Sequence, residues 1–332
     1  MHELAFPLLV ALIALALAFD FLNGLHDAAN SIATVVSTKL LGPVQAVVFA
    51  AVGNFAAYWI VGLHVAETVG KGIVDKEIVS PAVVFGALVG AMFWNIATWI
   101  KGIPSSSSHA LIGGLLGAGI AAAGFDAVES SGTTKTILAI FISPLIGFLI
   151  AMVLMLVTSV IFRRSTPRKA NNTFKVLHLC SSAAYSISHG GNDAQKTMGI
   201  ITVLLYSTGY LGGEFHVPEW VVLSCYVAIA LGTLSGGWRI IRTMGTGLTK
   251  LNHHSGFCAS TAGSIVVFSA SALGIPVSTT HAITGSVVGT GAARRTSAVR
   301  WTVATRVVTA WFITIPASAV VGAAFYLITR LF

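Results

Sequence analysis

One kind of polar string in this chain contains a carboxylate, and it occurs twice. Residues 24–30 read Gly-Leu-His-Asp-Ala-Ala-Asn and residues 190–196 read Gly-Gly-Asn-Asp-Ala-Gln-Lys, so that Asp27 and Asp193 occupy the same place. The two aspartates are 166 residues apart, half the length of the chain. A carboxylate in such a string can hold a cation or carry a proton, and we expect it to be assisted by His26, Asn30, Asn192, Gln195 and Lys196. Asn23 and His189 also lie beside the two aspartates in the sequence.

The second repeated string is rich in hydroxyl groups. Ser105, Ser106, Ser107 and Ser108 follow Pro104, and Ser278, Thr279 and Thr280 follow Pro276, with 172 residues between the two prolines. Each string precedes a residue run that favours a helix. Free amides and the positive end of a helix attract anions, so we expect both strings to bind an anion together.

Each string also has a purely structural interpretation. Serine and threonine cap helices and form hydrogen bonds between packed helices. Asp193 and Lys196 are one helical turn apart, a spacing at which they would neutralise each other. Asp27 has no lysine or arginine nearby in the sequence, and a carboxylate within a membrane span costs about 2.5 to 3.5 kcal/mol. We therefore expect it to face a polar cavity.

The composition identifies the surroundings of these strings. The chain has 332 residues, of which 55% are hydrophobic and only 9% charged, with a mean hydropathy of +0.86. Soluble domains carry about 25% charged residues. Apolar runs long enough to cross a bilayer lie at 4–19, 44–63, 82–100, 136–162, 219–234 and 302–328. The formal net charge of +8 is explained by basic cytoplasmic loops and does not indicate nucleic-acid binding.

Loop charge and the internal repeat together predict the fold. We expect an all-α polytopic membrane protein made of two inverted-topology repeats, each with a broken or re-entrant helical hairpin, and about ten to twelve helical segments. Residues 1–162 would form the first repeat, 163–175 a basic cytoplasmic linker and 176–332 the second repeat. The expected hairpins cover roughly 85–121 and 257–293. Both termini would lie outside, the 65–80 segment would be an external loop, and the basic segment 237–256 would be a cytoplasmic loop.

The repeated strings resemble motifs of the inorganic phosphate transporter family, PiT. The resemblance rests on residues 23–30, 191–196 and 104–109 and covers nearly the whole chain. It implies a phosphate symporter of the bacterial cytoplasmic membrane, of the bacterial low-affinity type. Phosphate would be bound by the two hydroxyl strings together with Asp27 and Asp193. The cation would be bound at the carboxylate strings, and no enzymatic activity or cofactor is implied.

The resemblance leaves the coupling ion open. Sodium-coupled members carry Asn-Asp in both repeats, whereas this chain has His26-Asp27 in the first and Asn192-Asp193 in the second. This favours a proton over sodium and transport of phosphate as a metal complex, with sodium coupling and sulfate transport as alternatives within the family. An anion channel is the alternative outside it. The sequence does not identify an accompanying metal, and the oligomeric state, including a homodimer, also stays open.

Overall fold

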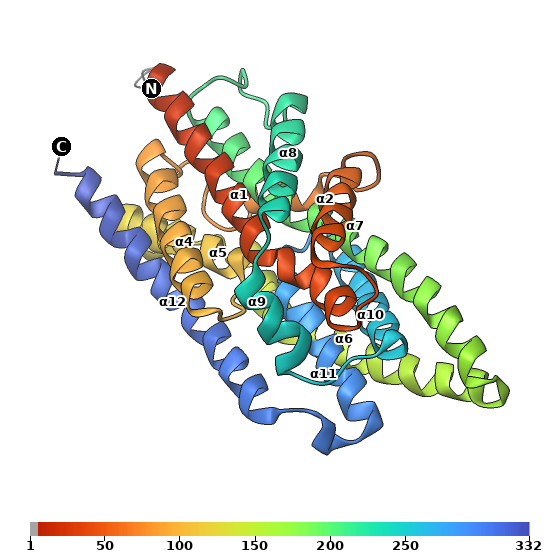
Figure 1. Ribbon diagram of the computed structural model, residues 1–332. Coiled ribbons are helices and arrows are strands. Elements are labelled where there is room, and N and C mark those ends of the chain that lie inside the picture. Colours follow the sequence, from red (N-terminus) through yellow and green to blue (C-terminus); the bar gives the residue numbers. More distant parts are fainter. Residues whose placement is uncertain (1–5, 332) are drawn as a thin grey trace.

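The computed structural model describes residues 6–331, and within them the chain is folded almost entirely into helices (Figure 1). The first half contains α1 (Phe6–Ser37), α2 (Pro43–Ala56), α3 (His64–Lys71), α4 (Pro81–Lys101), α5 (Ser107–Ala123) and α6 (Ser130–Ile161). The second contains α7 (Pro167–Ser207), α8 (Glu219–Ser235), α9 (Trp238–Arg242), α10 (His253–Ala272), α11 (Thr279–Arg294) and α12 (Trp301–Thr329). Six of these helices are long and apolar enough to span a membrane, or seven if the bent pair of 43–59 and 64–71 counts as one span. The expected helical, multi-span membrane protein is confirmed.

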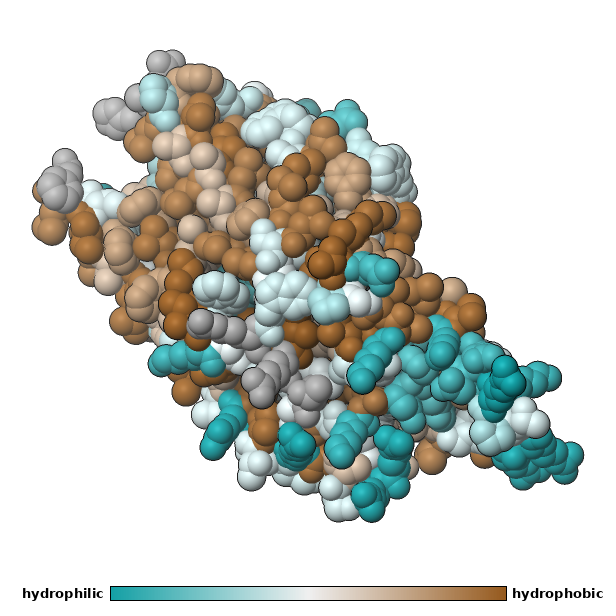
Figure 2. All heavy atoms as spheres, viewed as in Figure 1, coloured by the Kyte–Doolittle hydropathy of each residue, from teal (hydrophilic) through white to brown (hydrophobic). Residues whose placement is uncertain are grey.

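The outer surface is apolar where helices face lipid. In the most apolar 18-residue stretch of α6 only 17% of the residues are buried, and in that of α12 only 22%. Large side chains such as Leu145, Leu156 and Val320 are exposed there. Figure 2 shows apolar side chains along the flank of the molecule and hydrophilic ones gathered at the end that contains the α6–α7 connection.

Two helical hairpins bring the hydroxyl strings into the interior. After α4 the chain turns at Gly102, whose φ of 64° favours glycine, and α5 begins when the Ser106 side chain accepts a hydrogen bond from the His109 amide. After α10 the chain turns at Gly274 (φ 66°). Ser278 then caps the His281 amide in the same way. Both hydroxyl strings therefore lie at helix N-termini.

Each hairpin packs against the last helix of the other half of the chain. A Cβ atom added to Gly117 of α5 would lie 2.0 Å from the Ala319 carbonyl oxygen of α12. Added to Gly285 of α11, it would lie 2.1 Å from the Pro144 carbonyl oxygen of α6. Small residues thus let the backbones touch, as in other membrane helix interfaces.

The glycines of the carboxylate strings have the same purpose. A Cβ atom at Gly24 would lie 2.2 Å from the Ile229 carbonyl oxygen of α8, and one at Gly190 would lie 2.5 Å from Asn54 of α2. Helices α1 and α7 therefore each pack closely on the second helix of the opposite half. The halves are interleaved around the polar strings.

Several segments expected as loops contain helix. The expected linker 163–175 is mostly the start of α7, which begins at Pro167 with Thr166 as its cap, because proline is well suited to the first turn of a helix. The expected external loop 65–80 contains most of α3. The basic segment 237–256 contains α9 and a π-helical turn at 243–247. Short amphipathic pieces of this kind lack the long apolar run by which spans are recognised.

Candidate functional site: a buried polar centre

The tips of the two hairpins meet inside the protein. The Thr280 hydroxyl donates to the Ser105 carbonyl oxygen at 3.2 Å, and the Ser108 hydroxyl donates to the Val277 carbonyl oxygen at 3.4 Å. The hydroxyl residues at both tips are at most 2% exposed. The structure therefore brings the two hydroxyl strings, far apart in the sequence, into direct contact.

Asp27 of α1 is the acidic centre of the first half. Its Oδ2 atom accepts a hydrogen bond from the Ser107 hydroxyl at 2.8 Å, and the same hydroxyl lies against the Asn23 side-chain oxygen. His26 Nδ1 lies 2.8 Å from Asp27 Oδ1, while its Nε2 lies 3.1 Å from the Thr98 hydroxyl of α4. Asp27 is thus tied to both helices of the first hairpin.

Asp193 of α7 is the acidic centre of the second half. Its Oδ2 accepts a hydrogen bond from the Thr279 hydroxyl at 3.0 Å and lies 3.2 Å from His189 Nε2. Its Oδ1 forms an ion pair with the Lys196 ammonium. Asp193 is completely buried and Lys196 is 1% exposed. The pair foreseen as a structural alternative is therefore present, but it lies at the hairpin tips and not in a separate part of the helix.

Contacts between the halves repeat with the same symmetry. Asn30 donates to the Thr280 hydroxyl at 2.9 Å. Lys196, which occupies the corresponding place on α7, donates to the Ser108 hydroxyl and to the Val277 carbonyl oxygen at 2.8 Å. Each carboxylate string therefore contacts the hydroxyl string of its own half through the aspartate and that of the other half through Asn30 or Lys196.

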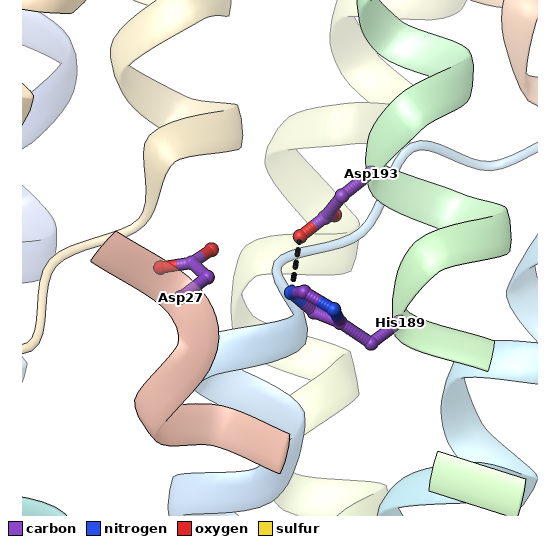
Figure 3. Close-up of side chains that lie close together, drawn as sticks. All are labelled: Asp27, His189 and Asp193. Atoms are coloured by element: carbon purple, nitrogen blue, oxygen red, sulfur yellow. Dashed lines mark ion pairs between the residues drawn. The ribbon is translucent and has the colours of Figure 1, made fainter. Parts of the chain in front are cut away.

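The two aspartates converge on one small volume. One carboxylate oxygen of Asp27, one of Asp193 and one ring nitrogen of His189 all lie within 4.8 Å of one another. Figure 3 shows the three side chains between α1 and α7, with His189 beside Asp193. Two carboxylates with an imidazole could hold a cation or share a proton. The neighbouring hydroxyls and helix N-termini are suited to an anion, so this centre can hold both charges together.

Some residues expected in the site have other partners. The Gln195 side-chain oxygen accepts hydrogen bonds from the Val65 and Ala66 amides, at 2.9 and 3.3 Å, and so caps α3. Asn192 donates to the Ser271 hydroxyl of α10 at 2.9 Å. These bonds attach α7 to its neighbours. These bonds give Gln195 and Asn192 a positioning role, while the Asn192 side-chain oxygen is buried without a hydrogen-bond partner among the described residues.

Ser105, Ser106 and Ser278 likewise have structural bonds. The Ser105 hydroxyl lies 2.8 Å from that of Thr314 on α12 and accepts from the Trp94 indole at 3.1 Å. Ser106 and Ser278 cap their helices. Four other hydroxyls contact the carboxylate strings. Those of Ser107 and Thr279 donate to the two aspartates, and those of Ser108 and Thr280 accept from Lys196 and Asn30.

Sequence reasoning overlooked three groups around the centre. Thr98 contacts His26, and Asn54 of α2 lies 3.0 Å from His189 Nδ1. Asp20 of α1 is completely buried, yet it stands within an apolar run and outside both repeated strings. A charged or amide side chain within a span is itself a signal of function, and it could have identified Asp20 and Asn54.

Comparisons with known proteins agree with one another. The model of the phosphate transporter family matches residues 23–322. A probable low-affinity inorganic phosphate transporter of Rhizobium meliloti (strain 1021) is 62% identical, covering 97% of each chain. One of Bacillus subtilis (strain 168) is 43% identical, covering 98% of each. A solved structure described as the sodium-dependent phosphate transporter superposes with a TM-score of 0.91 at 27% identity, covering 98% of this chain and 100% of that one.

Proposed function

Because the chain belongs to the phosphate transporter family, a family of transporters and not of enzymes, we propose that it imports inorganic phosphate across the bacterial cytoplasmic membrane together with a proton. The observation that carries this proposal is the meeting of two hydroxyl-rich helix N-termini with two carboxylates in the closed interior. The hydroxyls suit the anion, and the carboxylates suit the coupling cation. The two are close enough to be moved together.

The two halves act as inverted repeats, each with its own hairpin. Their helices follow the same order, and α1 and α7 run in opposite directions in Figure 1. Both termini lie at one end of the molecule, and the exposed basic residues of the α6–α7 connection lie at the hydrophilic end. With that basic end in the cytoplasm, both termini are outside. Rocking of two such repeats about a shared site gives alternating access.

Phosphate would accept hydrogen bonds that the hydroxyls at the hairpin tips now donate to the carboxylates. The Ser107 and Thr279 hydroxyls now donate to Asp27 and Asp193, and they can turn to donate to phosphate oxygens instead. Amides in the first turns of α5 and α11 add further donors. The centre is closed to solvent, so binding requires one hairpin to move away from the other.

The carboxylates give the site a means of choosing phosphate over sulfate. Near neutral pH phosphate retains one or two protons, as its second pKa is about 6 for an ester, while sulfate has none. An ionised carboxylate is an acceptor only, so Asp27 or Asp193 can accept a hydrogen bond from phosphate but repels sulfate. Sites that bond a ligand proton reject the analogue lacking it by about 10⁴-fold to 10⁵-fold.

Lys196 supports a proton rather than sodium as the coupling ion. Its ammonium contacts three oxygen atoms, on Asp193, Ser108 and Val277. A sodium ion would need oxygen ligands of this kind, and the ammonium already occupies these three. The solved relative described as sodium-dependent makes sodium symport the competing hypothesis. The cluster of Asp27, His189 and Asp193 also suits a divalent metal accompanying phosphate.

Uptake of labelled phosphate into proteoliposomes tests these proposals. A proton gradient, acid outside, should drive saturable accumulation in sodium-free buffer, and a proton ionophore should abolish it. Magnesium added outside should raise uptake if a metal-phosphate complex is carried. Accumulation that requires sodium would establish sodium symport instead, and uptake that never exceeds equilibrium would indicate a channel. Sulfate in excess should compete weakly, and strong competition would reject the carboxylate filter.

A further inference from the structure

A second acidic group lies in the interior, outside the central site. Asp20 is completely buried in α1, and neither of its carboxyl oxygens has a hydrogen-bond partner of normal geometry among the described residues. It is seven residues before Asp27, which corresponds to about 10 Å along the helix axis. It therefore lies between the central site and the end of the molecule where the N-terminus is found (Figure 1).

The surroundings of Asp20 come from three helices. Asn23 of α1 and Thr197 of α7 are its polar neighbours, without meeting hydrogen-bond geometry. The titratable groups that face it are Asp193 and Lys196 from α7 and Cys225 and Tyr226 from α8. Lys196 is already paired with Asp193, so Asp20 has no cation of its own among the described residues.

An ionised carboxylate in such a place is costly, because its charge is neither paired nor solvated. Protonation removes the charge and leaves a neutral group that a close-packed interior tolerates. A sodium ion would require several oxygen ligands, whereas a proton needs only one carboxyl oxygen. The polar neighbours named above supply one amide and one hydroxyl, and this sparse polar environment suits a proton.

Thr197 places a hydroxyl beside Asp20 on the helix that carries Asp193. It follows Asp193 by one helical turn on α7, and its hydroxyl has no hydrogen-bond partner among the described residues. A hydroxyl can accept a proton on one side while donating its own on the other. Asn23, the other neighbour, shares the Ser107 hydroxyl with Asp27. Asp20 and Asp27 therefore have the Asn23 side chain as a neighbour in common.

We propose that Asp20 is a proton-binding site of the transport cycle, distinct from the phosphate centre, and that it carries the proton that enters with phosphate. The carboxylate takes a proton from water when the outer side opens and releases it to water on the inner side, so one proton crosses for each cycle and no bond to phosphate is made. Protonated Asp20 allows the closed, dry packing seen here. This proposal rests on the proposed proton-coupled import and assigns the coupling proton to Asp20 in place of the central carboxylates, which then accept hydrogen bonds from phosphate.

The test is Asp20→Asn in proteoliposomes, because asparagine has the same shape but cannot release a proton. We expect phosphate exchange between two sides at equal pH to continue, while accumulation driven by a pH gradient is lost. For one coupled proton, a gradient of one pH unit should support roughly tenfold accumulation in the parent, and the variant should stay at equilibrium. Asp20→Glu should restore driven accumulation. Asp126→Asn, at an exposed acidic residue, is the matched control and should behave as the parent.

Stability separates a proton carrier from a structural group. Since the Asp20 carboxyl oxygens have no hydrogen-bond partner of normal geometry among residues 6–331, Asp20→Asn should unfold at a temperature no lower than the parent. Undiminished accumulation by Asp20→Asn would refute the site while leaving proton symport intact. Loss of exchange together with driven uptake would also refute it, because the residue would then serve binding or folding. A parent that ignores the pH gradient would instead refute the proposed coupling itself.

Discussion

Removing the Lys196 side-chain charge by Lys196→Met is the most direct test of how the polar centre is held together. Methionine keeps much of the side-chain length but removes the ion pair with Asp193 and the hydrogen bonds to the Ser108 hydroxyl and the Val277 carbonyl. Asp193 would keep its hydrogen bond from Thr279 and its contact with His189. Its charge would lose the nearest cation.

The magnitude follows from burial. Lys196 and Asp193 are 1% and 0% exposed, and breaking such a pair from one side costs about 3 to 5 kcal/mol because the remaining charge is left uncompensated. Adding Asp193→Asn removes that charge. The double variant should therefore be less destabilised than the sum of the two single variants, by about 0.5 to 3 kcal/mol.

Reversible unfolding titrations in mixed detergent micelles measure these free energies. Glu77→Gln is the control, because Glu77 pairs with Lys76 at 3.9 Å with the side chains 73% and 42% exposed, and such a pair is worth at most about 1 kcal/mol. The deficit of Lys196→Met should also shrink at acid pH, where a proton can neutralise Asp193. Additive single and double variants, or a deficit independent of pH, would show that the ion pair does not stabilise the centre.

Other substitutions test the remaining parts of the proposed mechanism and of the helix packing. Asp27→Asn or Asp193→Asn should abolish concentrative phosphate uptake while leaving a folded protein, measured in proteoliposomes and by gel filtration; normal accumulation by either variant would make that residue purely structural. Variants of either aspartate that still bind phosphate should show stronger competition by sulfate than the parent, and unchanged competition would exclude the carboxylate as the filter. Gly24→Ala should destabilise the protein by on the order of 1 to 3 kcal/mol through overpacking, since its Cβ would lie 2.2 Å from the Ile229 carbonyl oxygen. At Gly42 the nearest atom to a new Cβ is 3.4 Å away, so Gly42→Ala should change the unfolding midpoint little, and equal effects of the two would contradict the packing argument.

The sequence by itself determined the helical membrane fold and the polar strings. Long apolar runs can only be helices in a bilayer, so both hairpins and most of the apolar helices were predictable, including the turns near Gly102 and Gly274. Helix α7, which carries Asp193, corresponds to none of these runs. The repetition of Asp27 as Asp193 predicted that one unit occurs twice. These features are local, and local composition is sufficient to specify them.

Helical pieces without a long apolar run were missed for the same reason. The start of α7 and the short helices α3 and α9 are polar or brief, so nothing in their hydropathy distinguishes them from loops. Their helical form depends on caps such as Thr166 and on distant partners such as Gln195, which is 130 residues from Val65.

Only the tertiary structure decided which polar groups face one another. Pairing of Lys196 with Asp193 along the helix was a structural alternative visible in the sequence, but the bond of Lys196 to Ser108 joins residues 88 apart, and that of Asn30 to Thr280 joins residues 250 apart. The structure also separates Asp20, which has no hydrogen-bond partner of normal geometry in the described part of the chain, from the bonded Asp27 on the same helix. Helical periodicity sets the face on which a side chain lies. The identity of the helix packed against that face is decided by the whole fold, and with it whether a buried carboxylate is paired or left to bind a proton.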